Sequence, residues 1–494
     1  MTSQAAVPRH VLPVLVLAQF AGTSLWFAVN AVMPDLQREL GWPTAALGTL
    51  TSALQLGFIL GTLVFALLAV ADRFAPRLVF LVCALAGAAC TVMAWAMVRH
   101  YEALMVWRFA TGFFLAGIYP VGMKIAAQWY SRGLGAALGL LIGALVIGSA
   151  SAHALRAIGD QLPWPTLMLG VAALAAAGGV LLYATVGDAP GAVARVTALQ
   201  WRALASVWTD RKVRSSVLGY FGHMWELYTM WVLVPLILAT RLEGPALSWA
   251  AFWVLGAGAL GCAVGGWVAL RRGSARVAGT QLGLSGLCCL AAPWLMHAPD
   301  AAFYTWLVVW GITVAGDSPQ FSTLTARNAP PQAVGSVLTL TNSIGFGISI
   351  VSILLFVSLV DRVALGALIP WLAIGPALGL WALRPLVKAE RQSACAISPR
   401  WPARSQPHGP GPAWRPPRKK SSSAQTRSCG CCNGRSGRTG TGRNGGRNRS
   451  CRLSGRRGAR SPGRRSWPVA PAPGRSPAPG GAGCRARLPP ASGV

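Results

Sequence analysis

Apolar stretches dominate the first 390 residues and constrain the fold more than any other feature of the sequence. Each is close to the ~20 residues that an α-helix needs to span the hydrocarbon core of a bilayer. Helices satisfy their own backbone hydrogen bonds, as lipid-exposed segments must. The stretches are 11–33, 45–70, 77–98, 103–123, 133–156, 165–186, 214–238, 246–270, 277–297, 301–323, 334–360 and 364–384. We therefore predict an all-α polytopic membrane protein with twelve transmembrane helices.

Residues 104–124 and 303–323 form an internal repeat with an offset of 199 positions. The aligned pairs are Trp107 with Trp306, Gly112 with Gly311, Ala116 with Ala315, Gly117 with Gly316 and Pro120 with Pro319. Internal repeats that carry charges at membrane depth are typical of transporters. We predict two pseudo-symmetric six-helix halves. They are an N-terminal half (1–186) and a C-terminal half (214–390), joined by a central cytoplasmic loop (187–213).

The Lys and Arg residues of the connections predict the orientation. Fifteen lie on the side of the N-terminus and five on the other side. An excess of Lys and Arg marks cytoplasmic loops. We expect a multi-pass protein of the bacterial inner membrane with both termini in the cytoplasm.

Residues 391–494 form a different kind of sequence. This tail holds 22 of the 44 Lys and Arg residues, while all 13 acidic residues lie at or before Glu390. Such Arg/Gly/Pro/Ser-rich sequence cannot bury a core, so we expect it to be disordered. One interpretation is a basic arm that contacts anionic lipid or nucleic acid. We favour a frameshifted or misread terminus and expect no nucleic-acid partner.

Several first-half motifs carry a resemblance to a known family. The segment 67–77, LLAVADRFAPR, resembles the loop motif of the major facilitator superfamily, with Asp72, Arg73 and Arg77 in register and Leu68 and Ala75 in place of its glycines. The Arg-x-x-x-Gly pattern that starts at Arg108 resembles that family's helix 4 motif. The resemblance covers about residues 10–390. It implies two six-helix bundles around a cavity, a gating role for the Asp72–Arg77 loop, and a link between Arg108 and proton coupling.

Arg108 and helix 214–238 supply the main candidates for a functional site. A charge at the bilayer centre costs roughly 3 kcal/mol, so charges that remain there have usually found a partner or a cavity. Arg108 either binds an anionic solute or a titrating acid, or snorkels and holds helices together. Tyr220, His223 and Glu226 share one helix face. We expect Glu226 and His223 to carry protons, and a structural hydrogen-bonded pair is the alternative.

Asp317 precedes Pro319, which removes a backbone donor and favours a helix break. A break with polar backbone beside Asp317 suits a binding site or a hinge. Pairing of Asp317 with Arg327 or another arginine is an equally supported interpretation.

Three uncharged polar residues, Asn30, Gln55 and Asn342, are further candidates for lining a cavity. Each also fits a role as hydrogen-bonding glue between helices. We predict no metal site and no cofactor. Because no Gly-x-x-x-x-Gly-Lys-Ser/Thr loop is present, we expect no use of ATP.

These patterns predict a monomeric secondary active transporter that moves a small polar or anionic solute by alternating access, coupled to protons. The main alternative is a drug or metabolite efflux pump, which an aromatic cavity lining with few charges would favour. A non-transporting membrane sensor would need a folded cytoplasmic module, and neither the loop nor the tail supplies one. Since no hydrolytic or redox constellation occurs, we predict that the protein is not an enzyme.

Overall fold

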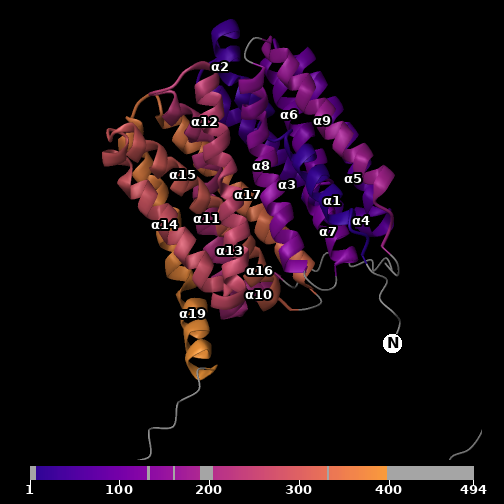
Figure 1. Ribbon diagram of the computed structural model, residues 1–494, viewed down its shortest axis with the longest axis vertical. Coiled ribbons are helices and arrows are strands. Elements are labelled where there is room, and N and C mark those ends of the chain that lie inside the picture. Colours follow the sequence, from indigo (N-terminus) through magenta and orange to yellow (C-terminus); the bar gives the residue numbers. More distant parts are fainter. Residues whose placement is uncertain (1–6, 131–133, 160–161, 190–203, 331–332, 398–494) are drawn as a thin grey trace, which may run out of the picture. The chain divides into compact units, whose positions relative to one another are not determined.

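The computed structural model describes residues 7–130, 134–159, 162–189, 204–330 and 333–397. The chain divides into two units, residues 1–405 and 406–494, and all described residues belong to the first unit. Every regular element among them is helical (Figure 1). The tail from residue 398 lies outside the described residues, so its predicted disorder and misread origin stay predictions.

The helices follow the predicted apolar stretches closely. In the first half they are α1 (Val11–Thr23), α2 (Ala28–Leu40), α3 (Ala45–Leu67), α4 (Val70–Arg73), α5 (Pro76–Ala96), α6 (Tyr101–Leu115), α7 (Tyr119–Trp129), α8 (Leu134–Ile158) and α9 (Trp164–Thr185). From the central loop onward they are α10 (Leu204–Thr209), α11 (Arg211–Leu238), α12 (Gly244–Gly256), α13 (Gly258–Arg272), α14 (Ser274–Leu295), α15 (Asp300–Gly316), α16 (Ser318–Asn328), α17 (Val334–Leu359), α18 (Leu365–Leu368), η3 (Ile369–Ala373) and α19 (Ile374–Ile397).

Ten segments of the described chain are long and apolar enough to cross a membrane. They include the broken helices α1–α2, α6–α7 and α12–α13, each counted as one segment. The two remaining predicted spans correspond to α14 and α15–α16. Polar side chains at the start of α14 and throughout α16 lower their apolar character. The polytopic all-helical fold is therefore confirmed, while the count of twelve spans stays a prediction.

The internal repeat is visible in the positions of the helix breaks. In the first half α7 spans residues 119–129, and in the second α16 spans residues 318–328, which is the same offset of 199. Pro120 and Pro319 each occupy the first turn of these helices, where a missing N–H removes no intrahelical bond. The prolines thus start a new helix at the same place in each half.

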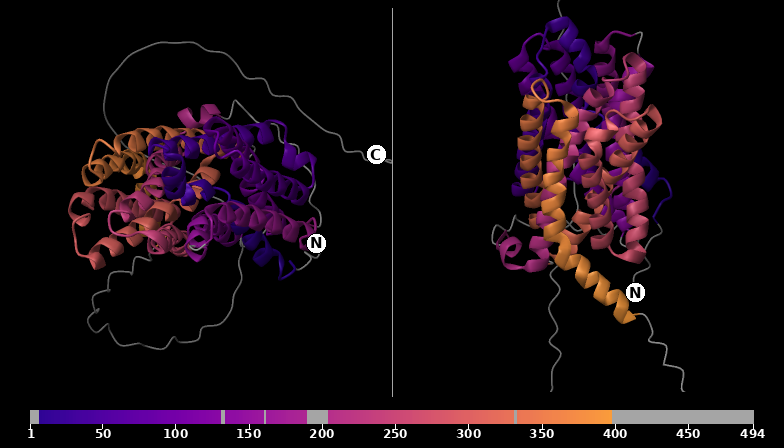
Figure 2. Two further views of the ribbon diagram at one scale, coloured as in Figure 1. Left: turned by 90° about the horizontal axis from the view of Figure 1, so that it is seen from above. Right: turned by 90° about the vertical axis from the view of Figure 1, so that its left-hand side faces the viewer.

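The two halves lie side by side (Figures 1 and 2), with α3 packed along α17 and α8 along both α12 and α13. Ring contacts also cross this boundary, as between Trp26 and Tyr228. At the end of the bundle where the described chain begins, α19 continues past the other helices. The interface between the halves is where the candidate site lies.

Candidate functional site

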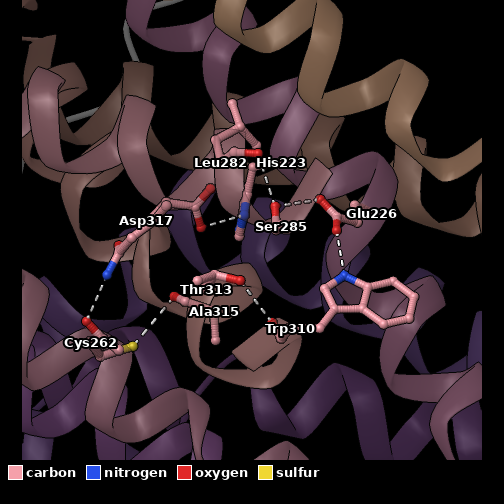
Figure 3. A network of polar contacts seen from close by, with 11 residues as sticks. His223, Glu226, Cys262, Leu282, Ser285, Trp310, Thr313, Ala315 and Asp317 are labelled. Atoms are coloured by element: carbon pink, nitrogen blue, oxygen red, sulfur yellow. Dashed lines mark hydrogen bonds and ion pairs between the residues drawn. The ribbon is translucent and has the colours of Figure 1, made fainter. Parts of the chain in front are cut away.

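Glu226 lies at the centre of a buried polar network in the second half (Figure 3). Its side chain is on α11, and its carboxylate accepts hydrogen bonds from α14 and α15. Trp310 Nε1 donates to Oε1 at 2.6 Å, Cys289 Sγ donates to the same oxygen at 3.1 Å, and Ser285 Oγ donates to Oε2 at 2.9 Å. A buried carboxylate that is surrounded by donors is a satisfied acceptor in its ionised form.

The same network can also accept a protonated Glu226. Ser285 Oγ lies 3.1 Å from the carbonyl of Leu282 as well as 2.9 Å from Glu226. A hydroxyl has one proton but two lone pairs. When Ser285 donates to Leu282, it can accept a proton from Glu226. The site therefore has a hydrogen-bonding arrangement for each protonation state of this carboxyl group.

A pair of titratable side chains, His223 and Asp317, lies next to this network, and His223 is one helical turn before Glu226 on α11. His223 Nδ1 is 2.8 Å from Asp317 Oδ1, and both side chains are almost fully buried. Asp317 stands at the junction of α15 and α16, so the predicted helix break does place a carboxylate in the protein interior. The structure pairs Asp317 with His223 instead of Arg327. A buried pair of this kind is stable only while each partner compensates the other.

Aromatic rings flank His223 and connect it to the space between the halves. The ring centroids of Tyr220 and Phe321 lie 5.7 and 6.0 Å from that of His223. Tyr220, His223 and Glu226 all lie on α11, and His223 contacts Asp317 from the α15–α16 junction, a pairing that the sequence did not predict. The structure does not pair His223 with Glu226, because each of the two binds a different helix.

A small cavity of about 40 Å³ lies between the halves beside this network. Its wall combines aromatic rings, aliphatic side chains and a few hydroxyl and amide groups. The lining residues with polar atoms are Tyr119, Tyr220, Tyr228, Trp231, Ser318, Ser322 and Asn342. Of the predicted candidates, only Tyr220 and Asn342 belong to this wall.

Four aromatic residues from both halves pack together at the cavity. Trp26 stacks on Tyr228 at 5.7 Å and contacts Phe58 at 5.0 Å. Phe346 lies 4.8 Å from Phe58 and 5.1 Å from Tyr228. Sequence reasoning missed this aromatic cluster, since nothing in the pattern distinguishes these rings from those that face lipid.

Arg108 binds backbone carbonyls of the first half. Its guanidinium donates to the carbonyls of Leu25 at 3.2 Å and Trp26 at 2.7 Å, at the junction between α1 and α2. The helix break leaves such carbonyls without intrahelical partners, and Arg108, which is 1% exposed, satisfies them. In this conformation its hydrogen bonds hold the broken helix, which is the second of the two predicted alternatives.

Asn30 and Gln55 bind other helices. Asn30 Nδ2 donates to Thr51 Oγ1 at 2.9 Å, and Gln55 Oε1 accepts from Ser349 Oγ at 2.9 Å. The second bond joins α3 to α17 and therefore crosses between the halves. Both contacts fit the role of glue between helices.

The predicted gating loop contacts the start of the central loop and the last helix of its own half. Arg77 lies 3.2 Å from Asp188, and its guanidinium stacks over Tyr183 at 5.2 Å. Arg73 is exposed, and the side chain of Asp72 lies outside the described residues.

The second half contains an equivalent contact. Arg276, 199 positions after Arg77, donates its Nη2 to the carbonyl of Glu390 at 2.9 Å. The Glu390 carboxylate accepts from the backbone N–H groups of Ala275 and Arg276, both at 3.0 Å. In both halves, an acidic residue after or near the end of the last helix thus binds the start of the third transmembrane segment.

Several partners at the site were missed from the sequence. Ser285 and Cys289 lie four residues apart, so they share a face of α14, which is a usable signal for a polar face in an apolar helix. Away from the site, the pairing of Asp35 on α2 with Arg156 on α8 at 3.0 Å was missed as well. Within the described residues no group of three His, Cys, Asp or Glu side chains could hold a metal ion.

Two solved structures resemble this fold. One is the human organic anion transporter MFSD10 (TETRAN), and the other is a point mutant of the nucleoside transporter NupG. Each has a TM-score of 0.59 and 15% sequence identity, and each comparison covers 76% of this chain and 99% of the other. No curated protein sequence gives a significant match.

A family model supplies the assignment. The model described as Major Facilitator Superfamily matches residues 15–353, which is well over half of the chain. The match spans the loop motif, Arg108, and the buried network around Glu226. The chain belongs to the major facilitator superfamily of secondary transporters.

Proposed function

We propose that this transporter couples the movement of a small polar solute to protons, with Glu226 and the His223–Asp317 pair as the proton-carrying groups. The observation that supports this proposal is the presence of two buried carboxyl groups near one turn of α11: Glu226 on that helix, and Asp317, which contacts His223 one turn earlier. One has hydrogen-bond partners for both protonation states, and the other is matched to a histidine.

Alternating access would give these groups their function. When one half rocks against the other, the hydration of a buried site changes, and water stabilises an ionised carboxylate that a dry site does not. Protonation of Asp317 removes the charge that holds His223. His223, freed in this way, leaves Tyr220 able to move at the cavity wall. Proton binding would thus change the shape of the solute cavity through the movement of Tyr220.

In the described conformation the cavity, about 40 Å³, is too small for a solute, so a solute would enter it only after the two halves rock apart. The residues of its wall then favour a solute with a flat ring and polar edges over a simple anion. None of the described residues that line the cavity is charged, and Arg108 is bound to the carbonyls of Leu25 and Trp26. Hydroxyl and amide groups fix the orientation of a ligand, while aromatic faces supply contact area. Among the anions in our sequence prediction, aromatic or weakly charged ones suit this wall best.

Efflux of a drug or metabolite is a second candidate. An aromatic lining without charges is the feature by which we expected to recognise an exporter. Tyr119, Tyr220, Tyr228, Trp231 and Phe346 provide it. We propose an orientation with both termini in the cytoplasm of a bacterial inner membrane, and a monomer as the functional unit.

A thermal-shift screen of the purified full-length protein tests the solute class. The panel holds nucleosides and other ring-bearing polar compounds, small organic acids, and bulky apolar cations. A ligand that binds only the folded state raises Tm by mass action. We expect the first group to stabilise the wild type and to lose its effect in Asn342→Ala. Stabilisation by apolar cations alone would favour the exporter.

The coupling is tested in proteoliposomes with the solute that the screen identifies. We expect an inward pH gradient to drive accumulation by the wild type. If Glu226→Gln and Asp317→Asn each respond to the gradient as the wild type does, the two carboxyl groups are not the proton carriers.

A further inference from the structure

A basic groove lies between α11 and α19, away from the cavity and its polar network. It has a volume of about 350 Å³, and its lining includes Arg211, Arg214, Arg384 and Lys388. All four of these side chains are exposed. None of the described residues that line the groove is acidic. The volume is within the range of sites that hold small molecules, about 300–1,000 Å³.

The four cations line the groove as two pairs, one from each helix. Arg211 and Arg214 are three residues apart on α11, and Arg384 and Lys388 are four residues apart on α19, so each pair shares a helix face. Like charges at these spacings repel each other. An anion bound in the groove would attract all four cations and so offset their mutual repulsion.

Two other arginines at this end of the bundle contact acidic residues in different ways. The Arg77 guanidinium pairs with the Asp188 carboxylate, and the Arg276 guanidinium donates to the backbone carbonyl of Glu390. Asp210, the acid nearest to Arg211 in the chain, instead accepts from the backbone N–H groups of Lys212 and Val213 and so caps α11. The four cations of the groove therefore differ from Arg77, because no acidic residue among the described ones lines the groove beside them.

The groove lies at the ends of two candidate membrane spans. Arg211 is the first residue of the candidate span Arg211–Leu238, and Lys388 lies four residues before the end of Leu365–Gln392. Trp381, one turn before Arg384, also lines the groove and is 64% exposed. Exposed Trp side chains are typical of the membrane–water interface.

We propose that this groove binds the phosphate group of an anionic phospholipid. Arg supplies planar, bidentate donors that suit phosphate oxygens, and Lys adds a point charge. The apolar face of Trp381 lies where the glycerol and the start of the acyl chains would follow. Basic pockets between transmembrane helices bind such headgroups in other membrane proteins.

The test compares lipids on the purified full-length protein in a neutral detergent. Tm is measured during titration with phosphatidylglycerol, phosphatidylcholine and inorganic phosphate, and bound lipids are counted by native mass spectrometry. The groove variant is Arg214→Gln/Arg384→Gln, and Arg211→Gln/Lys388→Gln is a second variant in case the first fails to fold. The control, Arg99→Gln/Arg362→Gln, removes two exposed cations at the other end of the bundle. The basic tail is the same in all these proteins.

We expect phosphatidylglycerol to raise the Tm of the wild type and the control by several degrees, and the groove variants by clearly less. The mass spectra should show one tightly bound lipid fewer in the groove variants. If inorganic phosphate reproduces both the shift and its loss, the site binds phosphate from a soluble source and the lipid assignment is overturned. Equal shifts with phosphatidylglycerol in the wild type and both groove variants would overturn the site itself.

Discussion

Gly112 and Gly311, 199 positions apart, make the same contact in the two halves. A Cβ at Gly112 would overlap the carbonyl of Leu54, and one at Gly311 would overlap the carbonyl of Val254. Each glycine thus lets two helices approach until a backbone carbonyl fills the space of a side chain. Small residues allow this close packing in membrane helices.

We predict that Gly112→Ala and Gly311→Ala each destabilise the protein by about 1–3 kcal/mol, because the added methyl group forces the helices apart. The measurement is the Tm in detergent. Gly170→Ala on α9 is the matched control, since a Cβ there meets no atom within 4 Å. A Tm for Gly112→Ala equal to that of the control would contradict the close contact.

Glu226→Gln should leave the fold intact and remove proton coupling. Glutamine keeps an acceptor for Trp310 or Ser285 but does not titrate. Solute-driven proton uptake into proteoliposomes, read with an internal pH dye, should fall about tenfold or more, in line with the loss of a proton-transfer group. The control is Glu102→Gln, an exposed acid at the start of α6, which should behave as the wild type. Undiminished proton uptake in a well-folded Glu226→Gln protein would exclude the role of this residue.

The His223–Asp317 pair should show coupled energetics. Removing one partner leaves a buried group uncompensated, so His223→Gln and Asp317→Asn should each be destabilising by several kcal/mol, on the order of 3–5. The double variant should be less destabilised than the sum of the two single variants, by about 0.5–3 kcal/mol. Unfolding of all four proteins in detergent measures this cycle. Additive effects would mean that the pair has no net interaction.

Arg108→Gln should lower the stability whether or not an anion is present. The change removes charge-assisted hydrogen bonds from two carbonyls at the α1–α2 break, and such bonds contribute about 1.5–3 kcal/mol. Arg99→Gln, an exposed arginine between α5 and α6, is the control. Tm is measured with and without small organic acids. Anion-induced stabilisation that disappears only in Arg108→Gln would show that this arginine binds solute.

Ala69 offers a test of backbone strain in the loop motif. It is the one non-glycine residue with positive φ among the described residues, at φ 49°. Left-handed backbone costs an L-residue roughly 1–2 kcal/mol, while glycine adds unfolded-state entropy of a smaller size. Ala69→Gly should therefore raise stability by up to about 1 kcal/mol in a denaturation experiment. A clear loss of stability would contradict the strain.

Hydropathy predicted the helices well because membrane spans have one strong physical requirement, which is a long apolar run. The helix breaks were predictable only where proline marks them, as at Pro319. The break between α1 and α2 contains Ser24 to Phe27 without proline, and its stabilising partner Arg108 is more than eighty residues away. Only the folded structure shows that Arg108 and these carbonyls meet.

The candidate site was partly predictable for a similar reason. Rare buried charges such as Glu226 and Asp317 are conspicuous in apolar helices, and the helical period places His223 near Glu226. The contact of His223 with Asp317, which comes from another helix, was not predictable from that period. The hydrogen-bond partners of Glu226 also come from other helices, so Trp310 and Ser285 were not identifiable from local spacing. Phe346 lines the cavity and packs on Phe58 of the other half, a contact that depends on how the halves meet and that the sequence pattern does not encode.

Each half contains one contact at the equivalent position: Arg77 with Asp188, and Arg276 with Glu390. These contacts bear on whether the two halves can be produced as separate fragments. Each fastens the beginning of a third transmembrane segment to the end of the same half. Duplication of an ancestral half would have duplicated this contact as well. A chain cleaved in the central loop after Asp188 would keep one such contact in each fragment. The two fragments, made together in one cell, are thus expected to find each other and reassemble.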